Sequence, residues 1–172
     1  VTTIARGAGR SRPLDRVIAE IRGLLAAGYQ EVVLTGVQLG SYGHDWDDRQ
    51  GLIHLIQAIL TETDTPRLRL SSLEPWDLDE VFFSLWAGEP RMCRHLHLPL
   101  QSGCDATLRR MRRRTSQVEF RQVVQWARQA APAMKITTDI IVGFPGETDD
   151  EFATTEAFVQ EMDFAGMHVF RY

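Results

Sequence analysis

The sequence has 172 residues, of which 44% are hydrophobic and 24% are charged, a composition typical of one globular domain and not of a disordered or fibrous chain. Its formal net charge is −4, so the chain as a whole is not basic, as many nucleic-acid-binding domains are. No apolar stretch approaches the ~20 residues that a membrane span requires, so no transmembrane segment is predicted. The two cysteines, Cys93 and Cys104, are too few for a secreted disulfide scaffold. We therefore expect a cytoplasmic protein.

Helix and strand patterns alternate along the whole chain. Apolar residues recur at helical spacing in six segments, and Ser116 with Glu119 and Thr148 with Glu151 form capping-box patterns at the start of two of them. Short apolar or alternating runs between the helices predict buried strands. The predicted helices cover residues 14–25, 52–60, 81–86, 105–111, 116–131 and 148–162, and the predicted strands cover residues 31–37, 68–73, 95–100, 136–144 and 167–170.

Five strands that each follow a helix predict consecutive right-handed βα units in a parallel α/β sheet. A complete eight-stranded barrel takes about 250 residues, so a chain of this length predicts a partial barrel. The chain starts with a helix and ends in an apolar strand, and we expect both ends to continue into a longer protein. A short open sheet is the alternative.

The segments that follow the strands carry small and polar residues. In parallel α/β folds ligands bind at the carboxyl ends of the strands. Small residues let the backbone approach a ligand, and Gln, Ser and Glu side chains provide hydrogen bonds that suit a polar cofactor such as a nucleoside. Any one of these loops could equally be a turn that requires glycine or proline. We call these segments the strand exits, and in chain order the four of them are residues 35–41, 71–75, 99–103 and 142–147.

Two other groups of residues suggest chemistry. Five arginines fall within residues 109–114, and their planar guanidinium groups suit phosphate or carboxylate, although a solvated helix end explains them locally as well. His95 and His97 lie two apart on a strand, a spacing that metal-dependent hydrolases use, with Asp139 as a further ligand. Histidines bonded within a core are commoner than metal ligands, and we expect Cys93 and Cys104 to be thiols without a role.

Several short motifs occur in a fixed order along the chain. They are Ala5-Arg6-Gly7, Arg10-Ser11-Arg12, Leu34-Thr35-Gly36, the run from His95 to Gly103, Met111-Arg112-Arg113, and the run from Asp139 to Thr148. This ordered set resembles the radical S-adenosylmethionine methylthiotransferases. Residues 111–115 and 168–170 are most similar to the branch that modifies N6-threonylcarbamoyladenosine in tRNA, and less similar to the branches that modify isopentenyladenosine or a ribosomal protein.

The resemblance implies a partial TIM-like barrel that uses S-adenosylmethionine and a four-iron four-sulfur cluster to add a methylthio group to C2 of a hypermodified adenosine near the anticodon. The implied partners are tRNA and an electron donor, with no DNA and no membrane. It also implies that residues 1–172 are a fragment of the radical SAM core domain, without the amino-terminal domain, the first strand with its cluster loop, and the carboxyl-terminal RNA-binding domain.

The three cysteines of the cluster loop are not in the sequence, and the resemblance places the last of them directly before Val1. Cys93 and Cys104 cannot replace three thiolate ligands, so we expect no metal site in this chain and no activity from it alone. A non-catalytic RNA-binding remnant is a further alternative.

The resemblance also assigns residues to the cofactor. Gly36, Val37 and Gln38 match the exit near its amino acid moiety, Ser72 and Glu74 the exit near its ribose, and Val142 to Phe144 the strand beside its adenine. It implies RNA phosphate contacts for the arginines, and it assigns no general acid or base. The expected cofactor-binding residues are Gly36, Val37, Gln38, Ser72, Glu74, Gln101, Ser102, Asp139, Val142 and Phe144, and the expected RNA-binding residues are Arg109, Arg112, Arg113 and Arg114.

Overall fold

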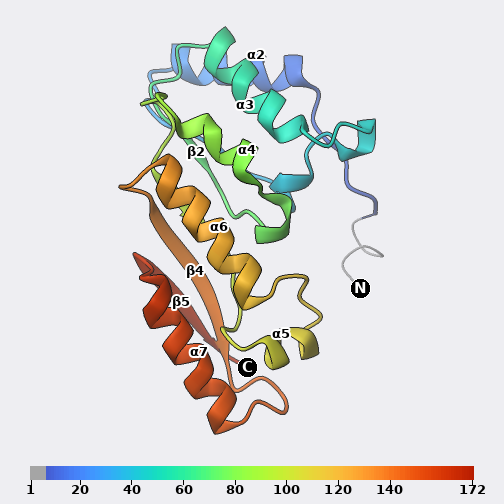
Figure 1. Ribbon diagram of the computed structural model, residues 1–172. Helices are drawn as coiled ribbons and strands as arrows, with labels where there is room; N and C mark the ends of the chain where they lie inside the picture. The colour runs from blue at the N-terminus through green and yellow to red at the C-terminus, as the bar shows by residue number, and fades with distance from the viewer. Residues whose placement is uncertain (1–6) are drawn as a thin grey trace.

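The computed structural model describes residues 7–172 (Figure 1), so Ala5 and Arg6 of the first motif lie outside the described residues. Helices and strands alternate as the sequence predicts. The helices are α2 (Leu14–Ala26), α3 (Gly51–Glu62), α4 (Glu80–Phe83), α5 (Asp105–Arg110), α6 (Gln117–Ala130) and α7 (Asp149–Met162), and the strands are β1 (Val32–Leu34), β2 (Leu68–Leu70), β3 (His95–His97), β4 (Lys135–Val142) and β5 (Gly166–Arg171).

All strand pairs in the described residues are parallel, which confirms the predicted α/β fold. The strands form two ladders, β1-β2 and β3-β4-β5. Backbone bonds connect the ladders, because the N–H of Leu68 donates to the carbonyl of Arg91 at 2.8 Å and the N–H of Leu73 donates to that of His97 at 3.0 Å. The strands therefore follow one another in chain order across one curved sheet.

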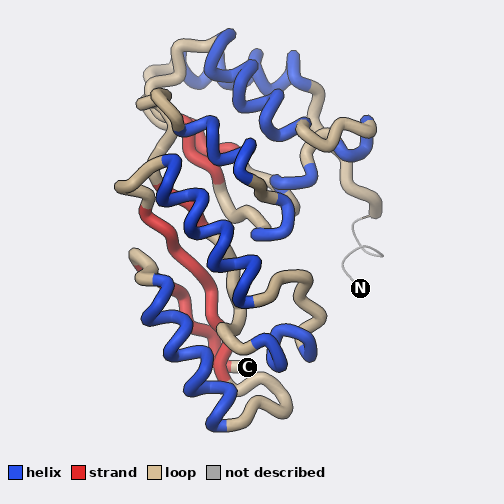
Figure 2. Tube along the Cα trace, viewed as in Figure 1, coloured by secondary structure: helices blue, strands red, loops and turns tan. Residues whose placement is uncertain are grey.

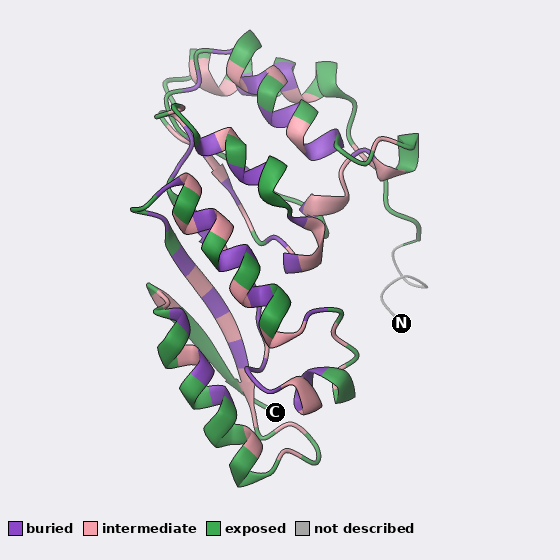
Figure 3. Ribbon diagram, viewed as in Figure 1, coloured by how far each residue is buried: buried purple, intermediate pink, exposed green. Residues whose placement is uncertain are grey.

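The helices lie on one side of the strands (Figures 1 and 2). Alternate strand residues, such as Leu96, Ile136 and Ile140, are buried beneath this helical layer. Figure 3 shows the buried stripes along α6 and β4, where Phe120 and Val123 belong to the core. The residues between them on each strand face away from the helices. The sheet therefore has one covered face and one face that forms the inner wall of the partial barrel.

Local sequence signals determine where α6 and α7 begin, whereas pairing between strands determines where the strands end. Both capping boxes are present, with the hydroxyls of Ser116 and Thr148 accepting from the backbone of Glu119 and Glu151. The strands predicted over residues 31–37 and 95–100 are shorter than expected, because regular pairing ends where the chain turns into the exit loops. The helix predicted over residues 81–86 is instead α4 followed by a 3-10 turn at Ser84–Trp86.

Within residues 7–172, no helix combines the length and the apolar character that crossing a membrane requires.

Candidate active site

The first two strand exits touch at the carboxyl edge of the sheet. After β1 the chain forms a 3-10 turn at Leu39–Ser41, and a Cβ atom at Gly40 would lie 2.6 Å from the Cβ of Asp77. Only glycine fits there. Burial raises the pKa of the Asp77 carboxyl above its ordinary range. The loop after β1 and the loop after β2 are thus packed together, and Val37 is 79% exposed beside them.

Arg113 joins the second exit to the third. Its Nη2 donates to Oε2 of Glu74 at 2.7 Å and to the carbonyl of Pro99 at 3.1 Å. Its guanidinium also lies 4.8 Å from the centre of the Trp76 ring. The Arg113 side chain is only 19% exposed, so it points into the rim that the four strand exits form. The expected contact with RNA phosphate would require an outward-pointing side chain.

The other arginines of the cluster divide into paired and exposed side chains. Arg110 forms an ion pair with Glu151 at the start of α7. Arg109, Arg112 and Arg114 are exposed, and Arg112 adopts a left-handed backbone with φ of 56°. A phosphate contact by this cluster therefore rests on these three residues.

The third exit holds a strained residue and a buried one. Gln101 has φ of 72°, which is unfavourable for a residue other than glycine. Its N–H donates to the backbone carbonyl of Asp139, and its carbonyl accepts from the N–H of Ile141, both at 2.8 Å. Ser102 is fully buried, with its hydroxyl 3.1 Å from that of Thr155 on α7. Ser102 therefore holds the loop against α7, whereas Gln101 lies at the edge of the site.

The fourth exit turns sharply after β4. Gly143 has φ of 75°, and its N–H donates to Oε2 of Glu147 at 2.7 Å. The Phe144 ring packs edge-to-face against Tyr172, with centroids 5.1 Å apart. Glu147 was not among the expected site residues, although its place in the Gly-Phe-Pro-Gly-Glu segment could have indicated it.

A network of imidazoles lines the inner wall on β3, β4 and β5. Oδ2 of Asp139 lies 3.2 Å from Nε2 of His97, and Oδ1 lies 3.1 Å from Nδ1 of His168. The Thr137 hydroxyl lies 3.0 Å from Nδ1 of His97 and 3.3 Å from Nε2 of His95, and burial lowers the pKa of His95. Sequence analysis missed the roles of Thr137 and His168, although the alternation of β4 places Thr137 on the same face as Asp139.

The described residues do not support a metal centre of their own. Residues 7–172 contain no group of three histidine, cysteine, aspartate or glutamate side chains that could hold a metal ion. His95 and His97 both bond to Thr137, and Cys93 and Cys104 are buried free thiols. The geometry therefore does not support the metal-dependent hydrolase alternative, and these residues do not fit an iron–sulfur cluster.

The rim does fit a polar cofactor. Buried polar atoms without a hydrogen-bond partner occur at four places along it, namely Nε1 of Trp76, Oδ2 of Asp77, Nε of Arg113 and Oε1 of Glu147. Because buried polar atoms are rarely left unpaired in a complete site, these atoms favour a ligand with several hydrogen-bonding groups.

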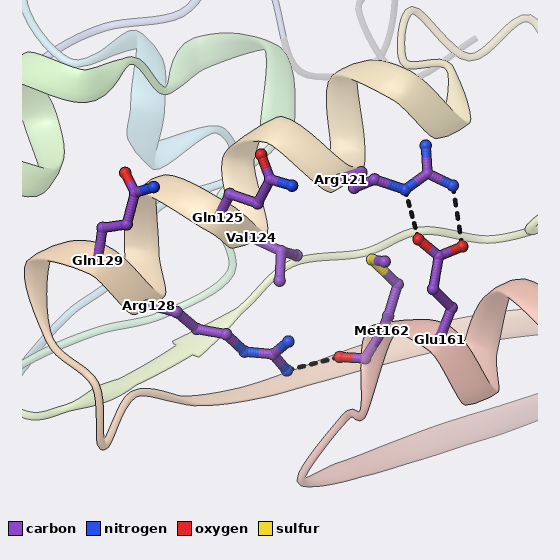
Figure 4. A pocket seen from close by; sticks show the side chains of 7 residues that line it. All are labelled: Arg121, Val124, Gln125, Arg128, Gln129, Glu161 and Met162. Carbon is purple, nitrogen blue, oxygen red and sulfur yellow. Dashed lines mark hydrogen bonds and ion pairs between the residues drawn. The ribbon is translucent and has the colours of Figure 1, made fainter.

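A separate groove of about 400 Å³ lies on the helical side, between α6 and α7 (Figure 4). Arg121 pairs with Glu161 across it, and Arg128 donates to the carbonyl of Met162 at 2.6 Å. Its charged groups are already paired, and it lies away from the strand exits. We therefore do not assign the active site to it.

The fold is a partial α/β barrel, and the carboxyl ends of its strands carry unpaired buried polar atoms. A profile of the radical SAM superfamily matches residues 2–159. The chain therefore belongs to the radical SAM superfamily. The structure of coproporphyrinogen III oxidase from Escherichia coli, described as a radical SAM enzyme, has the same fold, with a TM-score of 0.68 and 16% identity over 92% of this chain and 36% of that one.

Two kinds of tRNA methylthiotransferase are about equally similar in sequence. The chain is 41% identical over 170 residues to the threonylcarbamoyladenosine tRNA methylthiotransferase of Thermotoga maritima, covering 98% of this chain and 39% of that protein. It is 42% identical over 167 residues to the tRNA-2-methylthio-N(6)-dimethylallyladenosine synthase of Acidothermus cellulolyticus, covering 97% and 34%. The chain thus spans between a third and two fifths of these relatives, and identity does not separate the two branches.

Proposed function

We propose that this chain is part of the radical SAM core of a tRNA methylthiotransferase that adds a methylthio group to C2 of a hypermodified adenosine near the anticodon. The observation that carries the proposal is the similarity to two such enzymes over 97% or more of the chain. We further propose that the adenosine is N6-threonylcarbamoyladenosine. The resemblance of residues 111–115 and 168–170 to that branch supports this choice.

S-adenosylmethionine would be held along the rim. Gly36, Val37 and Gln38 would contact its amino acid part. Ser72 and Glu74 would contact its ribose. Gln101, Val142 and Phe144 would contact the remaining edge of the cofactor. Ser102 and Asp139 leave this set, because Ser102 holds the loop against α7 and Asp139 binds two histidines. When bound to a reduced iron–sulfur cluster, this cofactor supplies a radical, while the protein supplies orientation and a dry site.

The proposal requires three cysteine ligands from outside these 172 residues and an electron donor. It also assigns RNA phosphate contacts to Arg109, Arg112 and Arg114, which are exposed beside the third exit. Bases in a loop are already unstacked, so an enzyme can reach an adenine carbon atom there at modest cost.

The test is the nucleoside content of tRNA from the source organism, measured by mass spectrometry with and without the gene. We expect deletion to remove 2-methylthio-N6-threonylcarbamoyladenosine and to leave its unthiolated precursor, and the full coding sequence to restore it. Loss of the methylthiolated isopentenyladenosine instead would move the protein to the other branch. Unchanged levels of both nucleosides would contradict the proposal and favour a non-catalytic RNA-binding protein.

A further inference from the structure

Strand β5 presents a row of rings on the inner wall of the partial barrel. His168 and Phe170 alternate along the strand opposite Asp139 and Ile141 of β4, and Tyr172 directly follows the strand. Met167 and Val169 lie on the opposite face of β5, the side of Ile140, and are also exposed, by 42% and 57%. The His168 side chain is 73% exposed and Phe170 is 53% exposed. The row is therefore open to a ligand that enters the barrel.

The His168 ring is held in one orientation by the network behind it. The carboxylate of Asp139 can only accept, so the Nδ1–H of His168 donates to Oδ1 and the Nε2–H of His97 donates to Oδ2. Nε2 of His168 has no hydrogen bond to another described residue, and in the neutral imidazole with Nδ1–H this atom is an acceptor. The centroids of His168 and Phe170 are 6.4 Å apart, which places a polar imidazole edge next to an apolar ring.

This arrangement suits a purine with a polar substituent. An exposed aromatic ring stacks on a base whatever its sequence. A fixed imidazole edge binds N–H or O–H donors, and it loses its hydrogen bond to water when an apolar group covers it. A threonylcarbamoyl group offers such donors, whereas an isopentenyl group offers none.

We infer that Phe170 stacks on the adenine of the substrate and that Nε2 of His168 binds its polar N6 substituent, so that His168 selects threonylcarbamoyladenosine over isopentenyladenosine. This inference rests on the proposed function and names the residue that sets its substrate. Asp139 acts as a positioning residue, because it fixes the tautomer and the direction of the His168 ring.

The test is equilibrium binding of the full-length protein to three anticodon stem-loop RNAs, which carry threonylcarbamoyladenosine, isopentenyladenosine or unmodified adenosine beside the anticodon. We expect the wild type to prefer the first RNA, and His168→Phe to lose roughly 3- to 10-fold in affinity for it, the effect of one hydrogen bond. Affinity of His168→Phe for the unmodified RNA should stay unchanged. Asp139→Asn should weaken the same preference, because the amide can donate to His168 and release its tautomer.

Two further variants separate stacking from hydrogen bonding. Phe170→Ala should weaken binding of all three RNAs to a similar degree. Val169→Ala, on the opposite face of the same strand, is the matched control and should change none of them. If His168→Phe keeps the wild-type preference, the inference is wrong while the proposed function stands. If the wild type binds none of the RNAs, the proposed function fails, and the inference fails with it.

Discussion

Arg113 holds two strand exits together because its guanidinium satisfies a carboxylate, a carbonyl and an aromatic ring at once. Its partners are Glu74, Pro99 and Trp76, and only arginine has the planar donor group that reaches all three. The side chains of Arg113 and Glu74 are 19% and 29% exposed, so water screens the pair only in part.

We predict that Arg113→Ala lowers the free energy of unfolding by about 1–3 kcal/mol, because Glu74 and the Pro99 carbonyl lose their partner. Urea denaturation followed by circular dichroism measures this change. The control is Arg114→Ala at an exposed position, which should change the free energy by less than about 0.5 kcal/mol. Equal effects of the two substitutions would contradict the bridging role of Arg113.

The residues of the site were easier to predict than their partners. Glu74 and Asp139 could be identified because motifs and strand ends mark them. The arginine that binds Glu74 lies 39 positions away, and His168, the second histidine bound to Asp139, lies 29 positions away. Such pairs depend on which strands become neighbours. Ser102 was misassigned for the same reason. Its place in a motif indicated a contact with the ligand, but the side chain is buried against Thr155 of α7, a neighbour that only the fold brings close.

At the scale of elements, β1 and β2 are joined by an ion-pair cluster as well as by their ladder. Glu31 precedes β1 and accepts from Arg69 at 2.6 Å and from Arg67 at 2.9 Å. The hydrogen bond from Arg69 is the main reason that the pKa of Glu31 is lowered from its ordinary value of 4.5. Because the folded state binds the proton more weakly than the unfolded state, this contribution is complete above about pH 4.5 and is lost as the pH falls below it.

We therefore predict that Glu31→Gln lowers the free energy of unfolding at pH 7 by about 0.5–1 kcal/mol, a small value because the carboxylate is partly exposed. The difference from the wild type should shrink as the pH approaches about 3. Urea titrations at several pH values measure it. A difference that stays constant with pH would mean that the charge of Glu31 does not contribute.

Gly103 lies against α7, and substituting it tests how closely this helix packs on the third strand exit. A Cβ atom at Gly103 would lie 2.9 Å from the Cα of Thr155 and 2.9 Å from the Cβ of Phe158, both on α7. Gly103→Ala should push this helix outward and lower the thermal midpoint, at a cost of about 1–3 kcal/mol. Gly23 lies within α2 with nothing near its Cβ position, so Gly23→Ala should raise the midpoint. Calorimetry should therefore show thermal midpoints that shift in opposite directions for the two variants.

Helix starts were predictable because capping boxes are local, and Ser116 and Thr148 begin α6 and α7 as predicted. The 3-10 turns at Leu39–Ser41 and Pro75–Asp77 were not predicted. They form where two exit loops meet, and the contact between Gly40 and Asp77 that shapes them is not visible in either loop alone.

At the scale of the whole molecule, a net charge of −4 coexists with a local group of exposed arginines. RNA binding that uses Arg109, Arg112 and Arg114 should weaken steeply with salt, because each neutralised phosphate releases counterions. Replacing one of these arginines by alanine in the full-length protein should reduce the slope of log K against log salt for tRNA by about 0.7–0.9. Arg121→Ala is the control, since Arg121 pairs with Glu161 on the helical side. An unchanged slope in all three variants would place the RNA elsewhere.

The division of the sheet into two ladders has a dynamic consequence. Between β2 and β3 the regular ladder is replaced by isolated bridges, at Leu68 with Met92 and at Ser72 with His97. Segments with few cross-strand bonds open at lower free energy than continuous ladders. Native-state hydrogen exchange should therefore show two cooperative units that meet along this line, with β4 amides protected longer than those of β1. Such opening would widen the rim between its second and third exits, a motion that the Arg113–Glu74 pair restrains.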